Sequence, residues 1–64
     1  MADYAPEVKR ILRTNGCHFE RQGKGDHEIW YSPISKCRFP VDSKILSRHT
    51  ANAVLRQAGL PKAF

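Results

Sequence analysis

The segment Gly23 to Tyr31, with the sequence GKGDHEIWY, holds the residues best suited to chemistry. His27 follows a short loop that contains two glycines and Lys24. Histidine suits proton transfer because its unperturbed pKa of about 6.5 lies near the operating pH. Lys24 and the nearby Arg21 could hold a phosphate, and glycines such as Gly25 would let backbone N–H groups approach it closely. This pattern suits a site that holds a phosphodiester.

The net charge indicates an anionic partner. The chain has 64 residues, a formal charge of +5 and a pI of about 9.7. Such an excess on a short chain favours nucleic acid as the partner, with an acidic protein as the second class. A single domain over residues 1–64 buries only about 60% of the surface that its unfolded chain exposes. We therefore expect a shallow surface site rather than an enclosed pocket.

The sequence does not favour a membrane, secreted or metal-binding protein. It has no apolar run of about 20 residues, the length that spans a membrane, and its first residues do not resemble a signal peptide. We expect a cytoplasmic protein in which Cys17 and Cys37 stay reduced and are buried as small apolar side chains. Together with His18 and His49 they could form a zinc site by residue type, but the close paired spacing of zinc sites is missing. No metal or cofactor is expected.

Two helices are expected to flank the segment that carries His27. Residues 3–15 have apolar side chains at the spacing of one helix face, namely Tyr4, Val8, Ile11 and Leu12. Asp3 is the candidate N-cap of this helix, and Gly16 suits its end. The second helix is expected from Ser47 or His49 to Ala58.

Three short strands are expected between the helices, over residues 17–22, 27–32 and 38–42. The glycine loop before His27 suits a hairpin. Pro40 cannot donate a ladder hydrogen bond, so the third strand should lie at an edge or bend there. The order is α-β-β-β-α, and its simplest packing is an antiparallel meander with both helices on one face, which is an α+β fold.

The side of the sheet that carries His27 depends on strand alternation. His27, Ile29 and Tyr31 should share one face, whereas Glu28 and Trp30 should share the other. Ile29 is the most purely apolar of these residues, so we expect the helices to cover its face. That would place His27 at the rim of the core face. Tyr31 and Trp30 compete for the remaining burial, and periodicity alone does not decide between them.

Three motifs together resemble the HicA family of small mRNA interferase toxins. They are Gly-Lys-Gly-Asp-His-Glu-Ile-Trp-Tyr at 23–31, Phe-Pro-Val at 39–41, and Arg-His-Thr-Ala-Asn-Ala-Val-Leu-Arg-Gln-Ala-Gly-Leu at 48–60. The resemblance covers nearly the whole chain and implies an α-β-β-β-α domain similar to double-stranded-RNA-binding domains. The usual family pattern is Gly-Ser-His, whereas this chain has Asp26 before His27.

The resemblance implies a metal-independent endoribonuclease toxin that cleaves mRNA and so arrests translation and growth under stress. Its key residue would be His27. It also implies a HicB-type antitoxin that covers the catalytic surface and holds the toxin inactive. We expect the RNA to be single-stranded and the free chain to be a monomer.

Metal-free cleavage of RNA requires two proton transfers. A base takes the proton of a ribose 2′-OH, the oxygen attacks the adjacent phosphate, and a second group protonates the leaving 5′-oxygen. His27 can serve one transfer. His49 is a candidate for the other if the start of the last helix lies near His27; Lys24, Tyr31 and solvent are alternatives.

Two other functions remain open from the residues alone. The first is a non-catalytic RNA-binding module of the same fold, in which His27 only contacts the RNA. The second is an interaction protein whose positive charge serves an acidic partner.

Overall fold

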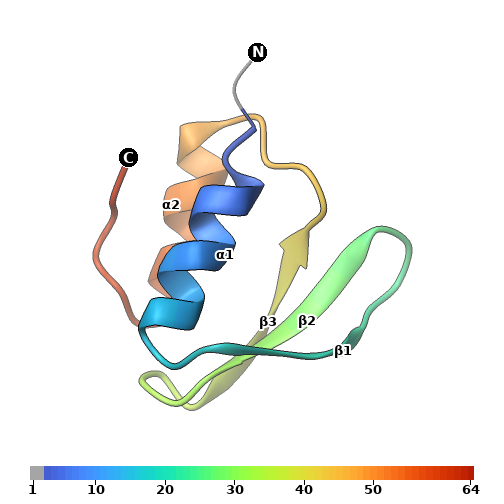
Figure 1. The fold of residues 1–64 in the computed structure, drawn as a ribbon, viewed down its shortest axis with the longest axis vertical. Helices are drawn as coiled ribbons and strands as arrows, with labels where there is room; N and C mark the ends of the chain where they lie inside the picture. Colours follow the sequence, from blue (N-terminus) through green and yellow to red (C-terminus); the bar gives the residue numbers. More distant parts are fainter. Residues whose placement is uncertain (1–2) are drawn as a thin grey trace.

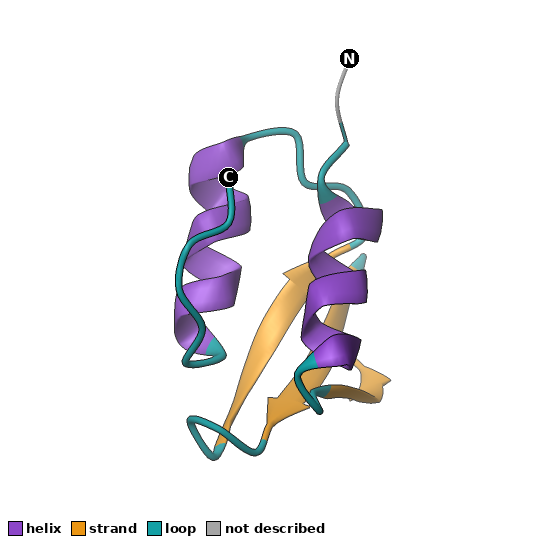
Figure 2. Ribbon diagram, turned by 60° about the vertical axis from the view of Figure 1, so that its left-hand side comes forward, coloured by secondary structure: helices purple, strands orange, loops and turns teal. Residues whose placement is uncertain are grey.

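The fold is a three-stranded antiparallel sheet with two helices on one of its faces (Figures 1 and 2). A computed structural model describes residues 3–64. Its elements, in chain order, are α1 (Ala5–Thr14), β1 (His18–Gln22), β2 (His27–Ser32), β3 (Cys37–Asp42) and α2 (Arg48–Gln57). The strand order is β1-β2-β3, so β2 is central and β3, which contains Pro40, is an edge strand. The α+β fold and the α-β-β-β-α order predicted from the sequence are confirmed.

The start of α1 differs slightly from the sequence prediction. Tyr4, rather than Asp3, occupies the N-cap position of α1, and Asp3 lies one residue earlier. The Asp3 carboxylate nevertheless accepts hydrogen bonds from the N–H groups of Ala5 and Ile45, both at 3.0 Å. These bonds, that of Ile45 first, lower the pKa of Asp3. Asp3 therefore joins the start of α1 to the loop that precedes α2.

The core lies between the helix pair and one face of the sheet. Trp30 of β2 is 1% exposed and lies opposite Phe39 of β3 in the ladder. The largest fully buried side chains besides Trp30 are Leu12, Ile45, Leu55, Val8 and Val41. Ser32, also fully buried, donates through its hydroxyl to the Ala58 carbonyl at 2.6 Å and accepts from the N–H groups of Ile34 and Ser35. This hydroxyl joins the β2–β3 turn to the end of α2.

The helices cover the face of Trp30, and the prediction that they cover the face of Ile29 is wrong. The indole buries more apolar area than an isoleucine side chain, and its N–H finds a partner in Glu28 Oε1 at 2.9 Å. Glu28 is in turn 3.3 Å from Lys9 Nζ on α1. His27 accordingly lies on the open face of the sheet and not at the rim of the core.

The two cysteines lie in different environments. Cys17 is buried, as predicted, but Cys37 is exposed because it lies at the first position of β3 beside the β2–β3 turn. Within residues 3–64 no three His, Cys, Asp or Glu side chains come together as a metal site, so the four residues of the zinc alternative are not gathered. None of the helices in the described part of the chain is both long and apolar enough to cross a membrane.

Candidate active site

His27 and Asp42 face each other across the β2–β3 ladder. The imidazole Nδ1 contacts the Asp42 Oδ1, and both side chains are about half exposed. A carboxylate on Nδ1 fixes the tautomer and the orientation of the ring. The contact leaves Nε2 as the ring nitrogen that can reach a substrate.

A shallow hollow of about 540 Å³ opens beside this pair. Its lining comes from two segments, residues 24–27 before β2 and residues 42–44 after β3. Lys24 and Lys44 supply one cation from each segment, and Ser43 supplies a hydroxyl. The two lysines are matched by Asp26 and Asp42, so with a neutral histidine the hollow carries no net charge.

Glycine permits the loop to close on β2. Gly25 has φ +63°, in the left-handed region that favours glycine. A Cβ atom on Gly23 would lie 3.1 Å from both the His27 carbonyl oxygen and the Ile29 side chain, which is tighter than an ordinary contact. The Gly23 N–H donates to that His27 carbonyl at 2.8 Å. The glycines therefore allow the loop to fold so that Lys24 lines the same hollow as His27.

The structure gathers some of the predicted site residues and separates others. Lys24 and Gly25 line the hollow with His27. Arg21 does not line it; it lies on β1 opposite Ile29, just after a register shift in the strand. His49, in the first turn of α2, lines a different hollow.

Sequence reasoning missed Asp42, Ser43 and Lys44 as site residues. The signal was present in the length of the turn between the second and third strands. A four-residue turn over 33–36 pairs Ser32 with Cys37, and the antiparallel ladder then brings Asp42 opposite His27. The hairpin register, worked out residue by residue, would have found this pair.

The opposite end of the open face carries aromatic and charged groups. The Arg38 guanidinium lies 5.4 Å from the centroid of the Tyr31 ring, and the His18 ring lies 5.6 Å from it. Arg38 Nε also donates to the Glu20 carboxylate at 2.6 and 2.8 Å. The open face thus carries polar and aromatic groups at its two ends with Ile29 and Pro40 paired between them, and no helix of the described residues covers it (Figure 2).

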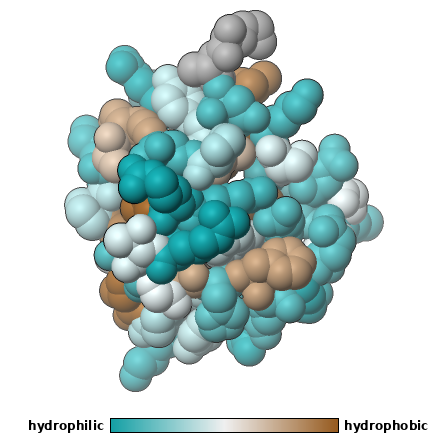
Figure 3. All heavy atoms as spheres, viewed as in Figure 1, coloured by the Kyte–Doolittle hydropathy of each residue, from teal (hydrophilic) through white to brown (hydrophobic). Residues whose placement is uncertain are grey.

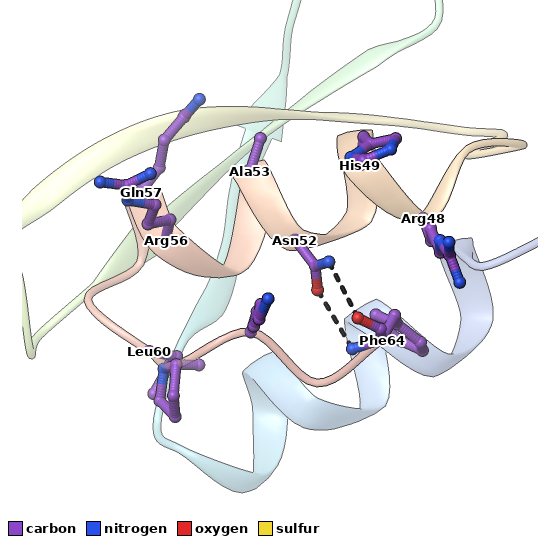
Figure 4. A pocket seen from close by; sticks show the side chains of 10 residues that line it. Arg48, His49, Asn52, Ala53, Arg56, Gln57, Leu60 and Phe64 are labelled. Atoms are coloured by element: carbon purple, nitrogen blue, oxygen red, sulfur yellow. Dashed lines mark hydrogen bonds between the residues drawn. The ribbon is translucent and has the colours of Figure 1, made fainter.

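A larger hollow of about 1100 Å³ lies along α2, between the helix and the C-terminal segment (Figure 4). Asn52 bonds that segment back to the helix: its Nδ2 donates to the Phe64 carbonyl at 3.0 Å, and its Oδ1 accepts from the Ala63 and Phe64 N–H groups. Phe64 packs edge-on against Tyr4, with ring centroids 5.1 Å apart. In the view of Figure 3, which has α1 in front and the strands beside it, hydrophilic residues cover most of the surface.

Comparison with known proteins identifies a family. A family model described as the HicA toxin of bacterial toxin–antitoxin matches residues 5–60. Those residues include all five helices and strands, both segments that line the hollow around His27, and Asp42. No curated protein and no solved structure matches the chain.

Proposed function

The chain belongs to the HicA toxin family of bacterial toxin–antitoxin systems, and on this premise we propose that it is an endoribonuclease that cleaves mRNA without a metal ion. The observation that carries the proposal is the His27–Asp42 pair beside two lysines on an open face of the sheet. For cleavage through a ribose 2′-OH a histidine can supply the base, a carboxylate can orient that histidine, and cations can offset the charge on the phosphate.

In the proposed reaction His27 acts as the base. Its Nε2 takes the proton of the 2′-OH, and the 2′-oxygen forms a bond to the adjacent phosphorus. The bond from phosphorus to the 5′-oxygen breaks, which gives a 2′,3′-cyclic phosphate on one product and a 5′-hydroxyl on the other. Asp42 holds the ring and stabilises the imidazolium that forms, as a carboxylate does in other histidine bases.

The lysines and a second proton donor complete the proposed site. Lys24 and Lys44 offset the charge that develops on the phosphate. One of them, or a water molecule between them, is the first choice of donor to the leaving 5′-oxygen, because both line the same hollow as His27. His49 remains the alternative donor, and it would require the RNA to reach the hollow along α2.

We also propose that a HicB-type antitoxin neutralises the chain by covering the open face of the sheet. This face carries His27 at one end and Tyr31 with Arg38 at the other. The family supports pairing with an antitoxin. A protein seated there would bury the catalytic base, and single-stranded mRNA could no longer enter.

The test is cleavage of a long mRNA by the purified chain in EDTA, with three variants alongside. His27→Ala should lose about 10²- to 10⁴-fold in rate, the usual contribution of a positioned acid or base. Asp42→Asn should lose about 10- to 100-fold in kcat at unchanged KM, because misorientation of a catalytic group is costly but binding is retained. His18→Ala, a histidine outside the hollow, should cut like the wild type.

Other results would change the proposal. Equal cutting by the wild type and His27→Ala would mean that another residue or a contaminant is responsible. Binding of RNA without any cleavage by the wild type would instead favour the non-catalytic RNA-binding module. Cleavage that EDTA abolishes would remove the metal-free step from the proposal.

A further inference from the structure

The positive charge of the chain is concentrated in the last third of its sequence. We call the hollow lined by residues 24–27 and 42–44 the catalytic hollow. Residues 1–42 contain seven Lys or Arg and six Asp or Glu, whereas residues 43–64 contain four Lys or Arg and no Asp or Glu. Most of the net charge of +5 therefore lies in the last third of the chain. That third forms α2 and the segment that returns along it.

Three of these cations line the hollow along α2, which no Asp or Glu side chain of the described residues enters. They are Arg48, Arg56 and Lys62, and all three side chains are exposed. Arg48 and Arg56 lie eight positions apart on the helix, which separates them by about 12 Å along its axis. Figure 4 shows them at opposite ends of the hollow, with the Asn52–Phe64 hydrogen bonds between them.

The three glutamates of α1 and the sheet are engaged in ion pairs. Glu7 pairs with Arg10, Glu28 with Lys9, and Glu20 with Arg38, so α1 and the sheet largely neutralise their own cations. No ion pair within residues 3–64 involves Arg48, Arg56 or Lys62. Three unpaired cations along one hollow make a site for an extended anion.

The catalytic hollow, in contrast, cannot attract a polyanion by its own charge. Its two lysines are balanced by Asp26 and Asp42. Contacts between cations and phosphates supply most of the sequence-independent affinity for nucleic acid. A site whose positive and negative charges cancel would therefore bind RNA weakly. The attraction must come from another surface that the same strand can reach.

The two hollows are close enough for one RNA strand to contact both. Lys44 lines the catalytic hollow, and Arg48, four residues later in the chain, lines the hollow along α2. Four residues of extended chain span at most about 14 Å. A strand of a few nucleotides could therefore contact both.

We propose that the hollow along α2 is a second RNA-binding surface, which holds the phosphate backbone of the substrate flanking the cleavage site. Two of the three cations are arginines, whose planar guanidinium binds a phosphate through two parallel hydrogen bonds. The RNA backbone is favoured over an acidic peptide because one RNA strand could reach both this hollow and the hollow around His27. The apolar side chains of Leu60 and Phe64 offer a floor for ribose and bases. This inference rests on the proposal that RNA is the substrate.

The experiment measures RNA affinity separately from cleavage. In a His27→Ala background, in which cutting should be too slow to interfere, a single-stranded RNA of about 20 nucleotides is bound at several salt concentrations. The variant Arg48→Gln, Arg56→Gln, Lys62→Gln should bind about tenfold more weakly, and the slope of log affinity against log salt should fall by about 2, since each single-strand phosphate contact adds about 0.7. The control Arg10→Gln, Arg13→Gln, Lys36→Gln removes the same charge outside the hollow and should change the slope less.

A second readout separates this proposal from the proposed function. With His27 intact, the α2 triple variant should cut a dinucleotide as fast as the wild type but cut the long RNA with a higher KM. If the wild type cuts neither, the ribonuclease proposal fails while the binding result still stands. Equal loss of RNA affinity in the α2 triple variant and the control would overturn the second surface. Wild-type RNA affinity with lost antitoxin binding would also overturn it and would assign the hollow to the protein partner.

Discussion

The two faces of β2 carry different tasks although their residues alternate along one strand. Glu28, Trp30 and Ser32 point to the helices, where Trp30 and Ser32 are fully buried. His27 and Tyr31 point to the open face, where His27 meets Asp42 and Tyr31 meets Arg38. Substitutions one residue apart should therefore affect stability or function, but not both. Such a separation suits a small domain whose proposed site must stay open to its substrate.

The largest effect is expected at Trp30. Trp30→Ala should reduce the free energy of unfolding by about 3–5 kcal/mol, the cost of removing a large aromatic side chain from a core. A domain of this length has about 3–10 kcal/mol in total, so the variant should be largely unfolded. Urea denaturation followed by circular dichroism measures this.

Tyr31→Ala is the matched control on the open face. The ring is only partly buried and its neighbours are His18 and Arg38, so the loss should be about 1 kcal/mol or less. A loss at Tyr31 equal to that at Trp30 would contradict the division of tasks between the faces.

A smaller effect is expected at Ser32. Ser32→Ala removes a buried hydroxyl that bonds the Ala58 carbonyl and two N–H groups, and should cost about 1–3 kcal/mol. Ser35→Ala is its control, because the Ser35 hydroxyl donates to the Gln57 carbonyl at an exposed position. That change should cost about 0.5 kcal/mol or less. Chemical unfolding of the two variants compares them, and equal losses would mean that burial of the Ser32 hydroxyl is unimportant.

The smallest effect concerns pH. The Trp30 indole N–H, and secondarily Lys9, hold the pKa of Glu28 below its ordinary value of 4.5. A carboxylate whose pKa is lowered by folding stabilises the protein above its unfolded pKa, and this contribution is lost as the pH falls through the lower folded value. The urea midpoint should therefore fall as the pH drops below about 4.5.

Glu28→Gln should lower the urea midpoint of unfolding at neutral pH. In this variant the midpoint should also fall less steeply as the pH drops below about 4.5. The control is Asp26→Asn, which also removes one carboxylate but breaks no ion pair within the described residues, and its midpoint at neutral pH should stay close to that of the wild type. An unchanged acid slope in Glu28→Gln would assign the effect to Asp3, whose pKa is lowered by the Ile45 and Ala5 N–H groups.

The sequence by itself determined the order of the elements, their approximate ends and the position of the catalytic candidate. Apolar spacing marked both helices, Gly16 and Gly59 have the positive φ angles that end them, and the glycine loop before His27 marked the β1–β2 hairpin. These features are local, because each depends on residues within a turn or two of one another. The motifs around His27 and in α2 were sufficient for the family.

Only the tertiary structure decided which face of β2 is buried, and therefore that the His27–Asp42 pair lies on the open face and not under the helices. Local alternation is symmetrical: it groups residues by face but does not say which face the helices cover. The neighbouring strand breaks that symmetry, because Phe39 and Val41 fall on the side of Trp30 while Asp42 falls on the side of His27. The separation of His49 from His27 is likewise a long-range property, set by how the loop after β3 directs α2 across the sheet.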